Sequence, residues 1–144
     1  MITNIGHPAI RVSDLDRSLA FYTGILGLRE AFRLPNAEGG VGAVYLYVAP
    51  NQFVELFPGG VAGARPTFEE VGYQHLCYVV EDALAAMEEM REKGAPIDGK
   101  FRIGTAKCPL FMTHDPDGNV IEIMELPPES LQAQATRRFT ASNL

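Results

Sequence analysis

His7-Pro-Ala-Ile-Arg-Val-Ser-Asp14 and His75-Leu-Cys-Tyr-Val-Val-Glu-Asp82 are two versions of one short stretch, and their repetition decides the fold. Each stretch opens with His and closes with Asp at the same spacing, and apolar residues at helical spacing follow both. The two Asp residues are of the type that caps a helix N-terminus, and Gly27 and Gly94 are placed to end the two helices. Such self-similarity predicts a chain built from two copies of one supersecondary unit.

The repeat continues downstream of each predicted helix. Asn51–Phe57 resembles Gly118–Met124, and both are short β-type runs that contain one Glu. Two further strands are predicted in each half, over residues 29–34, 41–48, 97–102 and 107–114. The sequence therefore predicts an α+β chain of two tandem βαβββ modules, over about residues 4–57 and 73–126. A Gly/Pro-rich linker over residues 58–72 joins the modules, and a tail over residues 127–144 holds a short helix at about 129–139.

Composition limits the function. Hydrophobic residues make up 47% of the 144, which is enough for one core, so the modules are expected to form one domain over residues 1–126. The formal charge of −6 argues against nucleic acid and anionic membranes as partners, and favours a small-molecule substrate. The chain shows no signal peptide and no membrane-length apolar run, which predicts a cytoplasmic protein. We interpret the tail helix as a docking or dimer helix and expect a homodimer.

Two His and two Glu occupy equivalent positions in the two modules. His7 and His75 open the repeated stretches, while Glu55 and Glu122 lie inside apolar runs, where an unpaired carboxylate is costly to bury. Two imidazoles and two carboxylates suit a six-coordinate divalent cation with two open positions. The sequence therefore predicts a metal site at these four residues. His114 has no counterpart in the repeat and is predicted to be a surface residue.

The chain resembles the vicinal oxygen chelate superfamily, which includes glyoxalase I, over nearly all of its length up to about Leu126. The resemblance is carried by these stretches: 7–22 with Leu26-Gly-Leu28, Phe53-Val-Glu-Leu56, His75 with Val80-Glu-Asp82, and 115–122. It implies a glyoxalase-like fold in which paired βαβββ modules form a cleft for one metal. The family's metal positions fall here on His7, Glu55, His75 and Glu122.

The resemblance also implies a chemistry. It favours a glyoxalase I-like (lactoylglutathione lyase-like) enzyme, in which the metal stabilises an enediolate and Glu122, or second Glu55, moves a proton next to a carbonyl. Arg11 matches the family's glutathione-contacting Arg, and Lys107 lies near the expected second anion contact. Where glyoxalase I carries an Asn-containing stretch after the first Glu, this chain has Leu56-Phe-Pro-Gly-Gly60.

Several alternatives stay open. An epimerase of an acidic carbon uses the same proton abstraction. An iron-dependent ring-cleaving dioxygenase would use His7, His75 and Glu122 as its triad. A non-enzymatic protein of the same fold would bind a drug or metabolite. The sequence does not distinguish Ni, Co, Zn, Mn and Fe, nor ligands from one chain from ligands of two swapped chains.

Overall fold

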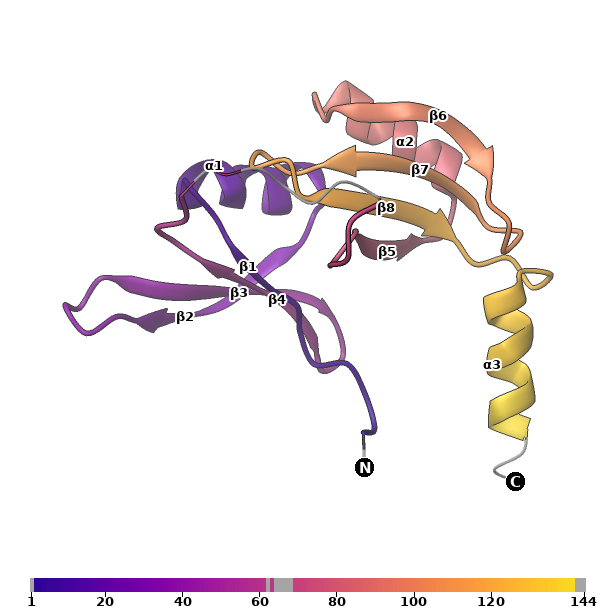
Figure 1. Cartoon of the computed structure of the whole chain (residues 1–144), viewed down its shortest axis with the longest axis horizontal. Helices are drawn as coiled ribbons and strands as arrows, with labels where there is room; N and C mark the ends of the chain where they lie inside the picture. The colour runs from indigo at the N-terminus through magenta and orange to yellow at the C-terminus, as the bar shows by residue number, and fades with distance from the viewer. Residues whose placement is uncertain (1, 62, 64–68, 142–144) are drawn as a thin grey trace. The chain divides into compact units, whose positions relative to one another are not determined.

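The computed structural model describes residues 2–61, 63 and 69–141. The remaining part of the predicted linker, at 62 and 64–68, lies outside the described residues, as do the last three positions of the tail. The chain divides into two compact units, Met1–Arg65 and Pro66–Leu144. Each unit contains one four-stranded mixed sheet with its own helical segment (Figure 1), which confirms the predicted α+β fold of tandem βαβββ modules.

The first unit follows the predicted element order. Its strands lie in the order β1-β4-β3-β2, with β1 parallel to β4 and the other neighbours antiparallel. The elements are β1 (Ala9–Arg11), α1 (Leu15–Leu19), η1 (Ala20–Ile25), β2 (Arg29–Pro35), β3 (Val41–Ala49) and β4 (Gln52–Phe57).

The predicted first helix changes its winding halfway. Asp14 caps α1 as expected, since its carboxylate accepts from the Arg17 N–H at 3.0 Å. Beyond Leu19, however, the chain forms the π-helix η1, and the Thr23 hydroxyl donates to the Leu19 carbonyl at 2.7 Å. Such side-chain back-bonding competes with the regular α-helical ladder. The wider turn buries the adjacent residues Phe21 and Tyr22 together.

Alternation along β3 and β4 separates the two faces of the first sheet. Val44, Leu46, Val54 and Leu56 are fully buried and form the core with residues of the helical segment. The residues between them point to the opposite face, because successive side chains of a strand alternate. We call this opposite side the open face of the unit.

The second unit repeats the topology, with strand order β5-β8-β7-β6 and a parallel β5–β8 pair. The Asp82 carboxylate caps α2 by accepting from the Ala85 N–H at 2.9 Å, and Gly94, with φ 85°, follows the helix as predicted. The elements are β5 (Leu76–Val80), α2 (Ala83–Glu92), β6 (Ile97–Ile103), β7 (Pro109–His114), β8 (Val120–Glu125) and α3 (Leu131–Ala141).

The turn between β7 and β8 is organised by Asp115. The buried Asp115 carboxylate accepts from the backbone N–H groups of Asp117 and Asn119, at 3.0 and 2.8 Å. The Asn119 side-chain amide also donates to Asp115, at 2.6 Å. This Asx-type network holds β7 and β8 in register, and it therefore fixes the position of the β8 carboxylates.

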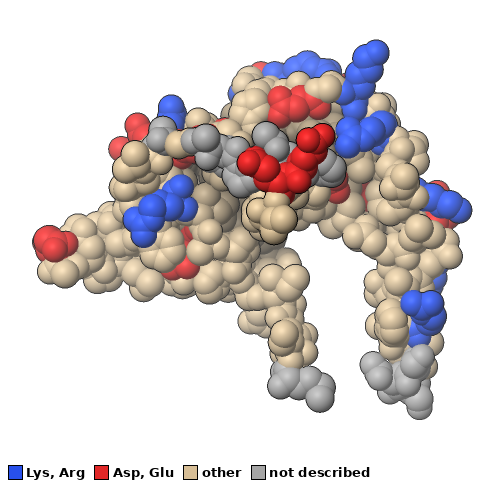
Figure 2. Space-filling view, viewed as in Figure 1, with Lys and Arg blue, Asp and Glu red and all other residues tan. Residues whose placement is uncertain are grey.

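The beginning of helix α3 is hydrogen-bonded to the loop between β6 and β7. The Leu131 N–H donates to the Ala106 carbonyl at 2.9 Å, and the buried Ser130 caps the helix by accepting from the Ala133 N–H at 3.2 Å. None of its own residues is buried, and Figure 1 shows it running away from the sheet. No helix among the described residues is long and apolar enough to cross a membrane. Basic and acidic side chains are both scattered over the face seen in Figure 2.

Candidate functional site

His7 and Glu55 lie side by side on the first unit. The Phe53 N–H donates to the Gly6 carbonyl and the Glu55 N–H to the Pro8 carbonyl, both at 3.0 Å. These bonds continue the parallel pairing of β1 with β4 and hold His7 beside the strand that carries Glu55. The His7 Nε2 is 3.4 Å from the Glu55 Oε2, so the structure brings the first predicted pair together.

Tyr45 orients this pair and was missed by the sequence analysis. It lies directly opposite Glu55 on β3, and its hydroxyl donates to the Glu55 carboxylate, which raises the pKa of Tyr45. The Tyr45 ring also meets the His7 ring edge-on, with centroids 5.2 Å apart. A signal was present, because Tyr45 and Tyr47 alternate with apolar residues in the strand predicted over residues 41–48, the last strand before the one that contains Glu55.

Aromatic rings surround Glu55 on the open face. Tyr45 stacks on Phe32 at 4.5 Å between centroids, and Phe53 meets the edges of Tyr45 and Tyr47. Glu55 itself is only 6% exposed. A buried carboxylate is stabilised by direct partners, and here these partners are His7 and Tyr45.

Arg11 lies on the same sheet but is held by its neighbours. It pairs with Phe57 across β1 and β4, and its guanidinium lies over the Phe57 ring at 5.5 Å. Its Nη1 donates to the Pro58 carbonyl at 3.1 Å. One carbonyl uses only part of the five-donor capacity of a guanidinium, so Arg11 retains donors for an anion.

His75 and Glu122 form the equivalent pair on the second unit. The His75 Nε2 is 3.8 Å from the Glu122 Oε2. The other Glu122 oxygen, Oε1, accepts from the Cys77 thiol at 3.4 Å. Burial, followed by the neighbouring Glu122 charge, raises the pKa of Cys77 to about 12. Cys77 is therefore a protonated donor at neutral pH rather than a nucleophilic thiolate.

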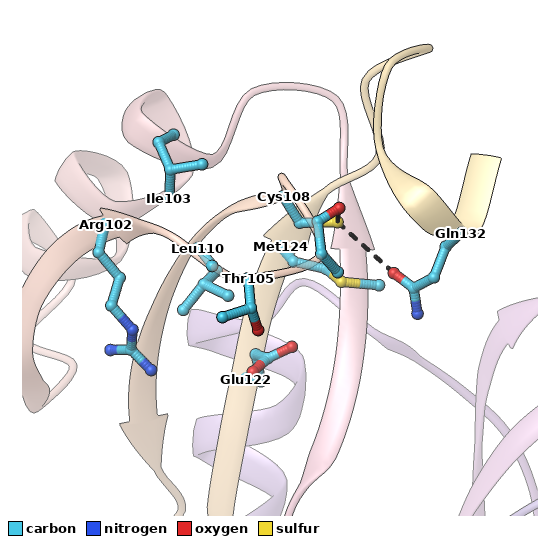
Figure 3. Close-up of a pocket in the computed structure, with 10 residues that line it drawn as sticks. Arg102, Ile103, Thr105, Cys108, Leu110, Glu122, Met124 and Gln132 are labelled. Atoms are coloured by element: carbon cyan, nitrogen blue, oxygen red, sulfur yellow. Dashed lines mark hydrogen bonds between the residues drawn. The ribbon is translucent and has the colours of Figure 1, made fainter. Parts of the chain in front are cut away.

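Glu122 lines a cavity of about 540 Å³ in the second unit (Figure 3). Cys108, Leu110 and Met124 form an apolar cluster along it. Its polar lining side chains include Arg102 from β6 and Gln132 from α3. Neither residue was predicted as a site residue, because neither lies in the repeated stretches that contain the His and Glu residues.

The candidate Lys107 and the third histidine, His114, which was predicted to lie at the surface, both lie outside this cavity lining. Lys107 is at the tip of the β6–β7 loop with a φ of 62°, and its N–H closes the turn by donating to the Gly104 carbonyl. Its side chain is exposed and does not line the cavity. His114 ends β7 and pairs through Nδ1 with Asp98 at 2.7 Å.

Each His–Glu pair has the donor chemistry of half a metal site. Two ligands that each lie about 2.1 Å from one cation are separated by about 3 Å when adjacent and about 4 Å when opposite. The observed separations, 3.4 and 3.8 Å, fall inside this range. Within the ranges 2–61, 63 and 69–141, no three His, Cys, Asp or Glu side chains gather closely enough to hold an ion. Each unit thus carries one His–Glu pair, with one nitrogen and one carboxylate oxygen close together.

Comparisons with known proteins identify similar sequences and similar folds. The sequence profile of the Glyoxalase/Bleomycin resistance protein/Dioxygenase superfamily matches residues 4–123. The ethylmalonyl-CoA/methylmalonyl-CoA epimerase of Cereibacter sphaeroides is 33% identical, over 83% of this chain and 93% of the relative. The lactoylglutathione lyase of Salmonella typhimurium is 29% identical, over 83% and 90%. The crystal structure of a glyoxalase family protein from Enterococcus faecalis superposes with a TM-score of 0.72 at 26% identity, covering 85% of this chain and 97% of that one.

Proposed function

Because the chain belongs to the Glyoxalase/Bleomycin resistance protein/Dioxygenase superfamily, we propose that it is a metal-dependent isomerase that moves a proton on the carbon next to a carbonyl. His7, Glu55, His75 and Glu122 hold the divalent cation in this proposal. When bound there, the cation supplies Lewis-acid stabilisation of negative charge on the substrate oxygen. The observation that carries the proposal is the position of Glu122, a ligand-type carboxylate that lines a cavity.

Glu122 is the proton-transfer base in this proposal. Its side chain is 17% exposed, against 8% for Glu55, and it lines the space a substrate would occupy. The Cys77 thiol and His75 hold its two oxygens from different sides, which fixes its orientation. A positioned carboxylate within reach of a carbon acid is the requirement for general-base catalysis.

Epimerisation of an acyl thioester is the first candidate reaction. Relatives named as epimerases of ethylmalonyl-CoA and methylmalonyl-CoA support it. So does the stretch Leu56-Phe-Pro-Gly-Gly60, which lacks the Asn-containing segment of glyoxalase I. Epimerisation requires that the proton leave one face of a carbon and arrive on the other, and the repeat supplies a second carboxylate, Glu55, for that role.

Isomerisation of a hemithioacetal is the second candidate and the one that the sequence resemblance favours. Relatives named lactoylglutathione lyase support it. Both candidates begin with removal of a proton next to a carbonyl. They differ in where the proton returns, which is the neighbouring carbon in the isomerisation and the opposite face of the same carbon in the epimerisation. They also differ in the substrate, so the assay compares the two substrates directly.

Full-length protein reconstituted with Ni²⁺, Co²⁺, Zn²⁺, Mn²⁺ or Fe²⁺ is tested in D₂O with two substrates. One is methylmalonyl-CoA, followed by loss of the α-proton signal in the ¹H NMR spectrum. The other is the hemithioacetal of methylglyoxal and glutathione, followed by thioester absorbance. Metal-dependent exchange with methylmalonyl-CoA supports the first candidate, and metal-dependent thioester formation supports the second. No metal-dependent turnover of either substrate would overturn the proposal.

A further inference from the structure

We propose that the C-terminal tail, which follows the region matched by the superfamily profile, forms part of the substrate site. In this proposal, Gln132 of α3 and Arg102 of β6 bind a carboxylate carried by the acyl group of the substrate. This inference rests on the proposed function. The superfamily profile ends at residue 123, whereas α3 begins at Leu131. Gln132 is therefore a feature of this chain's own tail rather than of the matched region.

The first turn of α3 is fixed beside the cavity. Its cap Ser130 is fully buried, and the Ser130 N–H donates to the Pro127 carbonyl at 2.9 Å. Leu131 is bonded to Ala106, which lines the cavity, and the Arg137 guanidinium donates to the Pro128 carbonyl at 2.6 Å. The bond to Ala106 fixes the start of the helix beside the cavity, while no residue of α3 itself is buried.

Gln132 is oriented by a cavity residue. Its Oε1 accepts from the Cys108 thiol at 3.5 Å, a contact drawn as the dashed line in Figure 3. An amide whose oxygen is engaged presents its NH₂ group as a donor. Among the described residues, the Gln132 NH₂ has no protein acceptor, although its side chain lines the cavity. The amide is therefore set to donate to a bound oxygen.

Arg102 supplies the positive charge. Of the described residues, only Arg102 and Glu122 line the cavity with charged side chains. Figure 3 shows Arg102 and Gln132 on opposite sides of the Glu122 carboxylate. The described part of the chain offers Arg102 no ion pair or side-chain hydrogen bond, in contrast to Arg33, which pairs with Glu30 at 2.7 Å. A guanidinium matches a carboxylate in a bidentate pair, so an acidic ligand satisfies it best.

The rest of the lining indicates what accompanies the carboxylate. Cys108, Leu110 and Met124 give the cavity an apolar side. If the carboxylate of an acyl group binds at Arg102, the carbon next to that carboxylate would lie near Glu122. An alkyl branch on this carbon would then pack against the apolar side chains. The cavity thus fits a short, branched or unbranched acyl group that ends in a carboxylate.

The test measures binding to the full-length, metal-loaded protein by isothermal titration calorimetry. The probes are malonyl-CoA, which carries the acyl carboxylate, and propionyl-CoA, which lacks it. Unmodified protein should bind malonyl-CoA at least about tenfold more tightly, the range expected of one hydrogen-bonded charge pair. R102Q should remove most of this preference and Q132A about threefold to tenfold of it, while propionyl-CoA affinity stays unchanged.

Matched controls separate recognition from general charge or folding effects. K100Q removes one positive charge from the same strand, and Q134A removes one amide from the same helix; neither residue lines the cavity. Both should keep the malonyl-CoA preference. Q132E keeps the side-chain length and adds a negative charge, so it should weaken malonyl-CoA binding more than Q132A does.

Equal binding of the two probes to unmodified protein, including no binding of either, would overturn the inference. So would an unchanged preference in both R102Q and Q132A. The inference and the proposed function fail in different ways. Lack of metal-dependent turnover of either substrate with an intact malonyl-CoA preference overturns the catalytic proposal alone, whereas turnover with no such preference overturns this assignment of Arg102 and Gln132 alone.

Discussion

Tyr45 and Glu55 lie directly opposite each other on β3 and β4, and the Tyr45 hydroxyl donates a hydrogen bond to the Glu55 carboxylate. Tyr45 also packs against the ring of His7. One side chain thus contacts both members of the first His–Glu pair. Residues that hydrogen-bond to metal ligands without binding the metal themselves commonly have a large effect on metal affinity.

Tyr45→Phe is expected to weaken metal binding by about 10-fold to 100-fold, because it removes the hydroxyl that orients Glu55 and keeps the ring. Competition of the protein with a metal-sensitive dye measures this affinity. Tyr47→Phe is the matched control on the same strand, since Tyr47 packs against Phe53 rather than Glu55. Equal affinity in the two variants would show that Tyr45 does not position the ligand.

Replacement of either predicted His ligand should lower the metal content of the purified protein. His7→Ala and His75→Ala each leave three of the four proposed ligands, and the content measured by mass spectrometry should fall well below one ion per chain. His114→Ala is the control, because His114 pairs with Asp98 and belongs to neither pair. Retention of a full metal complement in both single variants would contradict the four-ligand assignment.

Glu122→Gln should reduce turnover of the accepted substrate by about 10²-fold to 10⁴-fold, the usual contribution of a positioned general base. The amide keeps the side-chain size, so the circular dichroism spectrum and melting temperature should change little. Glu129→Gln, at an exposed position before α3, serves as the control. Full activity of Glu122→Gln would remove Glu122 from the role of base.

Tyr78→Phe should make the protein more resistant to alkali. Burial, with smaller effects from Tyr73 and Asp115, raises the pKa of Tyr78 above its usual value of 10.0. The folded protein therefore keeps a proton that the unfolded chain releases above about pH 10, and stability is lost as the pH rises through that range. The Tyr78 hydroxyl has no hydrogen-bond partner in the described part of the chain, so its removal costs little at neutral pH.

Urea unfolding of both proteins between about pH 8 and 11 measures this effect. The free energy of unfolding of Tyr78→Phe should be similar to that of the unmodified protein near neutral pH and should exceed it increasingly above pH 10. Parallel losses of stability in the two proteins would contradict the expected role of Tyr78.

Phe111→Ala should lower the free energy of unfolding by about 3–5 kcal/mol, because the ring is fully buried within the second unit and its removal leaves a cavity. Phe139→Ala, in α3, should change it by less than about 0.5 kcal/mol, since that ring is 63% exposed. Urea denaturation of the two variants measures the difference. Similar values for both would contradict the observed core.

The repeat was sufficient to predict the elements and their capping residues. Asp14 and Asp82 occupy the same N-cap geometry, and their positions follow from local hydrogen-bonding preference alone. The change to a π-helix after Leu19 was missed, because it depends on the Thr23 hydroxyl and on the burial of two adjacent aromatic residues. Helical spacing by itself carries no sign of such a change.

The candidate site was predictable only in part. Pairing of His7 with Glu55 and of His75 with Glu122 follows from strand order and register within each module. Arg102 and Gln132 do not belong to the repeated motifs, and their shared cavity arises from the docking of the tail on the β6–β7 loop. Long-range packing of this kind leaves no periodic pattern in the sequence.

Each unit carries one His–Glu pair, and the two pairs occupy matching positions in the repeat. If the proposed metal site is correct, an ancestral protein with a single module would have supplied only two of the four ligands. It would therefore have needed a second chain to form the complete site. Duplication and fusion would have made that pairing independent of protein concentration. Fusion would also have freed the two copies to diverge, one gaining the aromatic surroundings of Glu55 and the other the open cavity at Glu122.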